Sequence, residues 1–169
     1  MLSKLYWIEG PWEGKLAITP RPRGHEWIED EILLWKASEL DVIVSLLTRE
    51  EIVTLGLEEE ESFCLKFDLE FISFPIVDRD IPDSMLKTLN LVKELHAKLS
   101  DGKKIAIHCR QGIGRAAIIA SALLVFAGVD PEKSFVSVSQ ARGCSVPETA
   151  GQKDWIKGFA ENLIPLTMA

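Results

Sequence analysis

The chain of 169 residues has the length of one ordinary domain, and we expect residues 1–169 to fold as a single unit. Its hydrophobic fraction of 47% is enough for a sizeable core, while a formal net charge of −7 argues against a general binder of nucleic acid or acidic membranes. Three cysteines, an odd number, suggest neither a disulfide framework nor a zinc site, and the first residues lack a secretory signal pattern. We therefore expect a reduced, cytoplasmic, monomeric protein without metal or cofactor.

Hydrophobic periodicity predicts strands that alternate with helices along the chain. In chain order we expect a hairpin of residues 5–8 and 16–18, a helix over 27–38, a strand over 42–47, a short helix ending near Gly56, a strand over 71–75, a helix over 83–99, a strand over 104–108, and helices over 115–127, 131–141 and 149–161. This order implies an α/β fold with a mostly parallel central sheet of four to five strands and helices on both faces.

Two acidic segments of the first half receive structural interpretations. Thr48 and Glu51, three residues later, form the pattern of a capping box at the start of the short helix. The run Glu58–Glu61 is expected in a solvated loop or at a helix end. Neither segment is assigned to a functional site at this point.

The octet His-Cys-Arg-Gln-Gly-Ile-Gly-Arg at residues 108–115 carries most of the functional information. It joins a predicted strand to a predicted helix, and in parallel sheets ligands bind beyond the carboxyl ends of strands. Loop N–H groups and the helix N-terminus favour a bound anion and a thiolate. The octet thus predicts a cradle for a tetrahedral dianion, with Cys109 as nucleophile and a phosphate-binding loop of Arg110, Gln111, Gly112, Ile113, Gly114 and Arg115.

Individual roles follow from the chemistry of each residue type in the octet. Arg115 can hold two phosphoryl oxygens with its planar guanidinium, which lysine could not do. Gly112 and Gly114 are expected to admit positive φ and close approach of the backbone to the anion. His108 is expected behind the loop, where its imidazole either tunes the thiolate or serves only in packing.

A general acid for the leaving oxygen is sought in the segment Phe74–Pro82, where Asp78 and Asp80 are both candidates. This segment follows a strand that we expect beside the cysteine strand. Both carboxyl groups could instead cap the helix predicted from residue 83 or face water.

The octet resembles the signature of the cysteine-dependent protein phosphatases, in which His-Cys is followed by five residues and Arg. The segment Phe74–Arg79 resembles the general-acid loop of their dual-specificity branch, which favours Asp78 as the acid. Residues 141–149 and Gln152 resemble the pocket-lining loop of small prokaryotic-type members. The resemblance implies a phosphocysteine intermediate and a water-orienting role for Gln152, while Arg142 either holds the substrate's phosphate or braces the loop.

One departure from the family pattern concerns the second half of the reaction. The family usually has Ser or Thr after the arginine, whereas this chain has Ala116, which implies slow hydrolysis of the phosphocysteine. A single cation among the five loop residues favours a phosphoprotein over a phosphoinositide substrate. Two alternatives remain open: a phosphate-binding module with weak catalysis, and a rhodanese-like sulfurtransferase.

Overall fold

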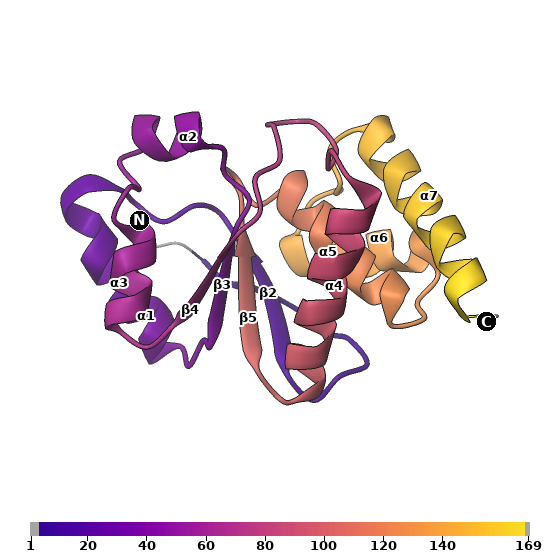
Figure 1. Ribbon diagram of the computed structural model, residues 1–169, viewed down its shortest axis with the longest axis horizontal. Helices are drawn as coiled ribbons and strands as arrows, with labels where there is room; N and C mark the ends of the chain where they lie inside the picture. The colour runs from indigo at the N-terminus through magenta and orange to yellow at the C-terminus, as the bar shows by residue number, and fades with distance from the viewer. Residues whose placement is uncertain (1–3, 168–169) are drawn as a thin grey trace.

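The computed structural model describes residues 4–167, and Figure 1 shows a central sheet with helices on either side. Five strands lie in the order β1-β2-β5-β3-β4. Their bounds are β1 Tyr6–Ile8, β2 Lys15–Thr19, β3 Val42–Ser45, β4 Glu70–Ser73 and β5 Lys104–His108. Only the β1–β2 pair is antiparallel, and the other three pairs are parallel. The predicted fold class and the N-terminal hairpin are confirmed.

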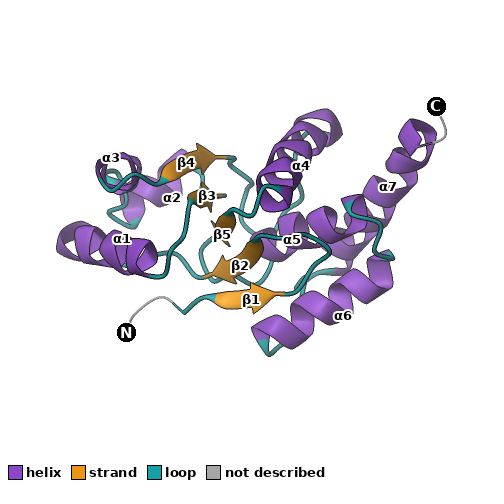
Figure 2. Ribbon diagram, turned by 90° about the horizontal axis from the view of Figure 1, so that it is seen from below, coloured by secondary structure: helices purple, strands orange, loops and turns teal. Residues whose placement is uncertain are grey.

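The helices form two layers, one on each face of the sheet, as Figure 2 shows. Their bounds are α1 Ile28–Ala37, α2 Arg49–Thr54, α3 Glu60–Lys66, α4 Met85–Ser100, α5 Arg115–Phe126, α6 Pro131–Arg142 and α7 Ala150–Thr167, with a 3-10 turn at His25–Trp27 before α1. Helices α1 and α3 cover one face, and α4 to α7 cover the other. In the part of the chain that the structure describes, no helix is long and apolar enough to cross a membrane.

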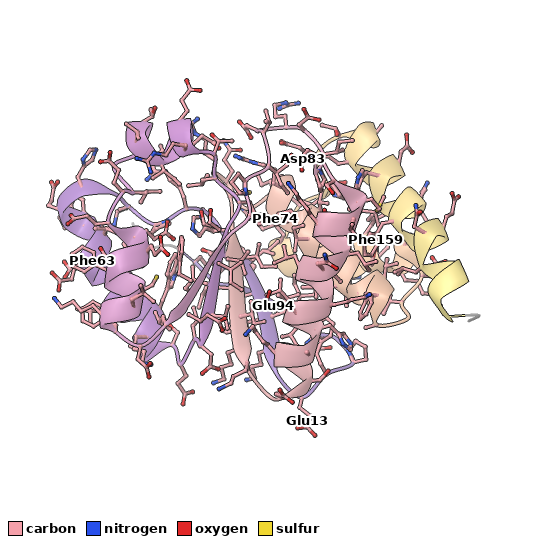
Figure 3. The ribbon with its side chains drawn as sticks, in the orientation of Figure 1. Glu13, Phe63, Phe74, Asp83, Glu94 and Phe159 are labelled. Atoms are coloured by element: carbon pink, nitrogen blue, oxygen red, sulfur yellow. The ribbon has the colours of Figure 1, made fainter. Side chains whose placement is uncertain are left out.

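Each face of the sheet buries its own hydrophobic cluster, because successive side chains of a strand point to opposite faces. On β5, Ile105 and Ile107 belong to the larger cluster beneath α4 to α7, while Ala106 belongs to the smaller cluster with α1 and α3. Phe159 of α7 lies in the larger cluster on the inner side of its helix (Figure 3). The same alternation sends the Cys109 side chain to the larger cluster.

The structure differs from the sequence predictions in three places. Strand β3 lies between β4 and β5, so the expectation that the strand before Asp78 adjoins the cysteine strand was wrong. Helix α3 was not predicted, because its acidic first turn conceals a buried side with Glu60 and Cys64. The last helix continues to Thr167, six residues beyond its predicted end.

Candidate active site

The end of β5 opens into a polar cavity of about 90 Å³ at the carboxyl edge of the sheet. Cys109 lies there at the start of the cysteine loop, which we define as residues 109–114. The cavity is lined by Asp78, Arg79, Cys109, Arg110, Gln111, Ile113, Gly114, Arg115 and Glu148. The sulfur therefore faces a polar hollow of a size suited to a small anion, although the residue is only 2% exposed.

The cysteine loop wraps around the sulfur, and the backbone N–H of Gly112 donates to Cys109 Sγ at 3.3 Å. Gly112 has φ +68°, and a Cβ there would lie 2.7 Å from the carbonyl carbon of Thr19. Glycine is thus required at this position both for its backbone conformation and for its close approach to β2. A backbone donor to sulfur stabilises the thiolate form of a cysteine.

Gly114 differs from the expectation of a positive φ, since its φ is −94° at the N-cap of α5. Its lack of a side chain matters instead for packing. A Cβ on Gly114 would lie 2.8 Å from Glu148 Oε1 and 3.1 Å from Gln152 Nε2. This glycine lets the segment before α7 close onto the cysteine loop.

Arg115 opens α5 and is 2% exposed, with its guanidinium held from two directions. Its two terminal nitrogens donate to the two carboxylate oxygens of Glu51 at 2.7 and 2.9 Å. One of them also donates to the carbonyl of Ile76 at 2.9 Å. Burial opposes the charge of Arg115, but the bonds to Glu51 and the negative charges of Cys109, Glu51 and Asp78 raise its pKa. A guanidinium fixed in this way is oriented before substrate arrives.

Glu51 reaches this position from the N-terminus of α2, where the predicted capping box is confirmed. Its carboxylate accepts from the backbone N–H of Thr48 at 3.0 Å and from the Arg115 guanidinium. Burial raises the pKa of Glu51, but the hydrogen bonds from Arg115 and Thr48 outweigh it and leave the pKa below its ordinary value. The residue therefore caps a helix and orients the arginine with one carboxylate.

The β4–α4 loop, residues 74–84, crosses above the cysteine loop, and the labelled Phe74 and Asp83 lie near its two ends (Figure 3). Asp78 Oδ1 lies 3.1 Å from an Arg115 nitrogen, and the Asp78 side chain is half exposed. Asp80 Oδ1 instead accepts from the backbone N–H of Ile81 within the same loop, at 2.8 Å. Of the two candidate acids, Asp78 is the one that lines the cavity.

His108 lies on the opposite face of the sheet from the Cys109 side chain and is fully buried. Its Nε2 lies 2.6 Å from Glu60 Oε1 of α3, and its Nδ1 lies 3.4 Å from the carbonyl oxygen of Cys109. Glu60 is the first residue of α3, as the helix-end alternative for the acidic run had it, but it is 2% exposed, so the alternative of a solvated loop was wrong at this residue. The imidazole thus connects α3 to the backbone of the nucleophile.

Arg142 and Gln152 approach the site from the C-terminal half. Arg142 donates to the carbonyls of Gly112 and Gln111 at 3.1 and 3.2 Å, and its guanidinium stacks over the Tyr6 ring at 4.1 Å. This geometry matches the bracing alternative for Arg142. Gln152 is fully buried and donates to the carbonyl of Asp80 at 3.2 Å.

Comparison with known proteins assigns the chain to a family. Residues 19–129, more than half of the sequence, match the family described as "Polymorphic toxin system, DSP-PTPase phosphatase". The chain belongs to this phosphatase family. Protein 197R of Invertebrate iridescent virus 6, named as a tyrosine phosphatase, is 30% identical to this DSP-PTPase chain over 109 residues, which are 62% of the chain and 40% of the viral protein.

Human cyclin-dependent kinase inhibitor 3 is 30% identical over 91 residues, which are 53% of this chain and 42% of the human protein. The chain thus spans about two fifths of the length of these curated relatives. Among solved structures, a kinase-associated phosphatase with its catalytic cysteine changed to serine superimposes with a TM-score of 0.90 at 20% identity, covering 97% of both chains. The active form of Tk-PTP gives 0.76 at 25% identity, covering 93% of this chain and 96% of that one.

Sequence reasoning did not assign three acidic residues of this DSP-PTPase site to function. Glu51 was interpreted only as a helix cap and Glu60 only as part of a charged run. Glu148 was included in the segment 141–149 that resembles a pocket-lining loop but received no role of its own, although it lines the cavity. A local signal existed for Glu51, since an N3 carboxylate of a capping box is fixed in orientation. The sequence offered no comparable signal for the pairing of Glu60 with His108, 48 residues away.

The other two cysteines are separated from the nucleophile in different ways. Cys64 is fully buried in the smaller cluster, on the other face of the sheet from Cys109, and burial raises the pKa of its thiol. In this place Cys64 packs as a small core residue. Cys144 is exposed in the segment between α6 and α7.

Proposed function

We propose that this chain hydrolyses phosphate monoesters through a phosphocysteine at Cys109. The carrying observation is the position of Cys109 Sγ, which lines an anion-sized polar cavity and accepts a backbone N–H while Arg115 lines the same cavity. Family membership supports the same chemistry. The reaction has three requirements. Cys109 supplies the nucleophile, Arg115 stabilises the charge of the transition state, and Asp78 donates the proton.

In the first step the thiolate of Cys109 attacks phosphorus, and the bond from phosphorus to the ester oxygen breaks. The loop N–H groups and Arg115 bind the three equatorial oxygens, whose charge spreads as the transition state forms. Asp78, protonated in the substrate complex, gives its proton to the leaving oxygen, which departs as an alcohol. The half-exposed carboxyl lies where a leaving group would emerge from the cavity.

In the second step water attacks phosphorus, the bond from sulfur to phosphorus breaks, and inorganic phosphate leaves with the thiolate restored. Asp78, now ionised, accepts a proton from this water. Ala116 is fully buried immediately after Arg115 and offers no hydroxyl to the departing sulfur. Slow breakdown of the phosphocysteine is therefore expected.

The substrate that we propose is a phosphoprotein, with phosphoserine and phosphothreonine accepted as well as phosphotyrosine. Arg79 and Arg110 line the cavity together with Glu148, and such mixed charge suits a polypeptide more than a polyanionic inositol ring. Val77 and Ile81, exposed on the β4–α4 loop, offer apolar contacts to residues that flank the phosphate. We expect the protein to act as a cytoplasmic monomer without cofactor, and sedimentation of the purified chain tests the monomer.

The test is hydrolysis of an aryl phosphate by the purified chain, inhibited by vanadate and abolished in Cys109→Ser. A panel of phosphopeptides and phosphoinositides then ranks substrates, and Cys109→Ser can be used to trap the preferred one. Protection of a phosphopeptide without hydrolysis of any phosphate ester would instead identify a binding module. Consumption of thiosulfate with cyanide would identify a sulfurtransferase, for which Asp78 is unnecessary.

A further inference from the structure

The N-terminus of α7 touches the β4–α4 loop through one fully buried amide. Gln152 Nε2 donates to the backbone carbonyl of Asp80 at 3.2 Å, across 72 residues of sequence. Gln152 is 0% exposed, whereas Asp80 is exposed, so the donor of this part-buried bond is removed from bulk water and the acceptor residue is not. Buried amide groups are costly to leave without partners, which makes such a bond a firm constraint on the loop.

The rest of the Gln152 amide is occupied by its own helix. Its Oε1 accepts from the backbone N–H of Thr149 at 3.3 Å, and its backbone N–H donates to Thr149 Oγ1 at 3.1 Å. These reciprocal bonds are a capping box, which fixes the orientation of the side chain. The oxygen of the amide therefore points to Thr149, and its nitrogen points to Asp80.

The Asp80 carbonyl belongs to a tight turn that carries Asp78. The backbone N–H of Asp80 donates to the carbonyl of Val77 at 3.0 Å, and Arg79, between the two aspartates, has φ +61°. A left-handed non-glycine residue restricts the turn to few conformations. A constraint on Asp80 is therefore transmitted to the direction of the Asp78 side chain.

Other contacts on the turn differ in strength from the Gln152 bond. Arg115 binds the carbonyl of Ile76 at 2.9 Å and thereby holds the start of the loop. Arg79 and Glu148 lie 3.7 Å apart, and the Arg79 side chain is largely exposed, so this pair holds the loop only weakly. The hydrogen bond from the buried Gln152 amide is thus the main constraint on the part of the turn that follows Asp78 in the sequence.

We propose that Gln152 is a positioning residue for Asp78, acting through the Asp80 carbonyl in the first chemical step. The assignment rests on the proposed phosphatase function and replaces the water-orienting role that the resemblance implied for this residue. A positioning role predicts a kinetic signature that depends on the leaving group. A water-orienting role predicts slower breakdown of the phosphocysteine, whatever the leaving group.

The test is Gln152→Glu, which keeps the acceptor for Thr149 but replaces the donor to Asp80 with a carboxylate oxygen. The measured quantity is kcat/KM, which reports steps up to and including phosphorylation of the cysteine, for a series of aryl phosphates. Phenyl phosphate, whose leaving group needs a proton, should lose about tenfold, a fraction of the 10²–10⁴-fold that a general acid supplies. Dinitrophenyl phosphate, whose leaving group needs none, should lose less than about twofold.

Gln140→Glu is the matched control, because Gln140 is exposed on α6 and the substitution changes charge in the same way. In an Asp78→Asn background, Gln152→Glu should have little further effect on phenyl phosphate, since the group it positions is already lost. Thermal unfolding and the dinitrophenyl phosphate rate together report whether the variant is folded.

The outcomes distinguish a failure of the positioning role of Gln152 from a failure of the proposed phosphatase function. An unchanged leaving-group dependence in folded Gln152→Glu, with slower decay of the phosphocysteine in rapid-mixing experiments, overturns the positioning role and leaves the phosphatase intact. Equal losses on all substrates, or equal losses with and without Asp78, also overturn it. Absence of any wild-type hydrolysis that depends on Cys109 would defeat the proposed function itself.

Discussion

At the N-terminus of α2, Thr48 and Glu51 form a capping box whose carboxylate also binds the Arg115 guanidinium. At the N-terminus of α7, Thr149 and Gln152 form a similar box whose amide also binds the Asp80 carbonyl. Glu51 and Gln152, which stand at position N3 of the two boxes, are both buried, and each holds a group near the cavity. Glu51 is charged and binds the Arg115 cation, whereas Gln152 is neutral and binds the Asp80 carbonyl.

The comparison shows how one local motif can serve two separate parts of a reaction. A carboxylate is suited to α2 because its target is a cation that must remain charged and correctly oriented. A neutral amide is suited to α7 because its target is a carbonyl, which needs a donor and would be repelled by a carboxylate. We expect the α2 box to affect phosphate binding and the α7 box to affect proton transfer.

The largest effect is expected from Glu51→Gln, which removes the bidentate pair with Arg115. Misplacement of the guanidinium should lower kcat/KM by about 10²-fold, the loss typical of a misaligned catalytic group. The loss should be similar for phenyl and dinitrophenyl phosphates, because the phosphoryl oxygens are the same in both. Glu50→Gln, at an exposed neighbour on α2, is the control and should be close to wild type. A leaving-group-dependent loss in Glu51→Gln would remove the distinction between the two boxes.

Glu60 allows a second test, because it is a buried carboxylate that does not belong to a capping box. Glu60→Gln should lower the free energy of unfolding by about 1–3 kcal/mol, since a hydrogen bond to a charged group is replaced by a weaker one next to buried His108. Urea unfolding measures the change, and Glu61→Gln, exposed on the same helix, should change little. Equal stability of the two variants would mean that the contact with His108 contributes nothing.

The charge of Glu51 also predicts how stability depends on pH. Its pKa is lowered by folding from an ordinary value of 4.5, so its contribution is fully present above about pH 4.5 and is lost as the pH falls through the lower folded value. The difference in free energy of unfolding between wild type and Glu51→Gln should be constant near neutral pH and decrease under more acidic conditions. A constant difference at all acidic pH values would contradict the ion pair.

The smallest effect is expected from a substitution at Ala116, which belongs to neither the α2 nor the α7 capping box. Rapid mixing of the wild type with an aryl phosphate should give a burst followed by a slower steady state. Ala116→Ser should raise the steady-state rate by at most about tenfold, the factor that corresponds to 1.4 kcal/mol, and should leave the burst rate unchanged. A linear trace from time zero, together with no gain in Ala116→Ser, would count against slow phosphocysteine breakdown.

Sequence alone predicted the α/β fold and the confirmed capping box at Thr48, because hydrophobic periodicity and capping are local properties of the chain. It also brought Cys109 and Arg115 together, since both lie in one short loop between β5 and α5. It did not predict α3, whose acidic residues gave no periodic signal, nor the position of β3 between β4 and β5.

Tertiary structure alone decided which distant side chains support the site. Glu51 and Glu60 bind Arg115 and His108 across sequence separations of 64 and 48 residues, and Gln152 binds the Asp80 carbonyl of the β4–α4 loop across 72 residues. Glu and Gln are residue types that mostly lie on protein surfaces, and only the packing of α2, α3 and α7 around the sheet brings each of these three to its partner. Local chemistry therefore identified the groups that face the substrate, whereas the groups that orient them depend on contacts made only in the folded chain.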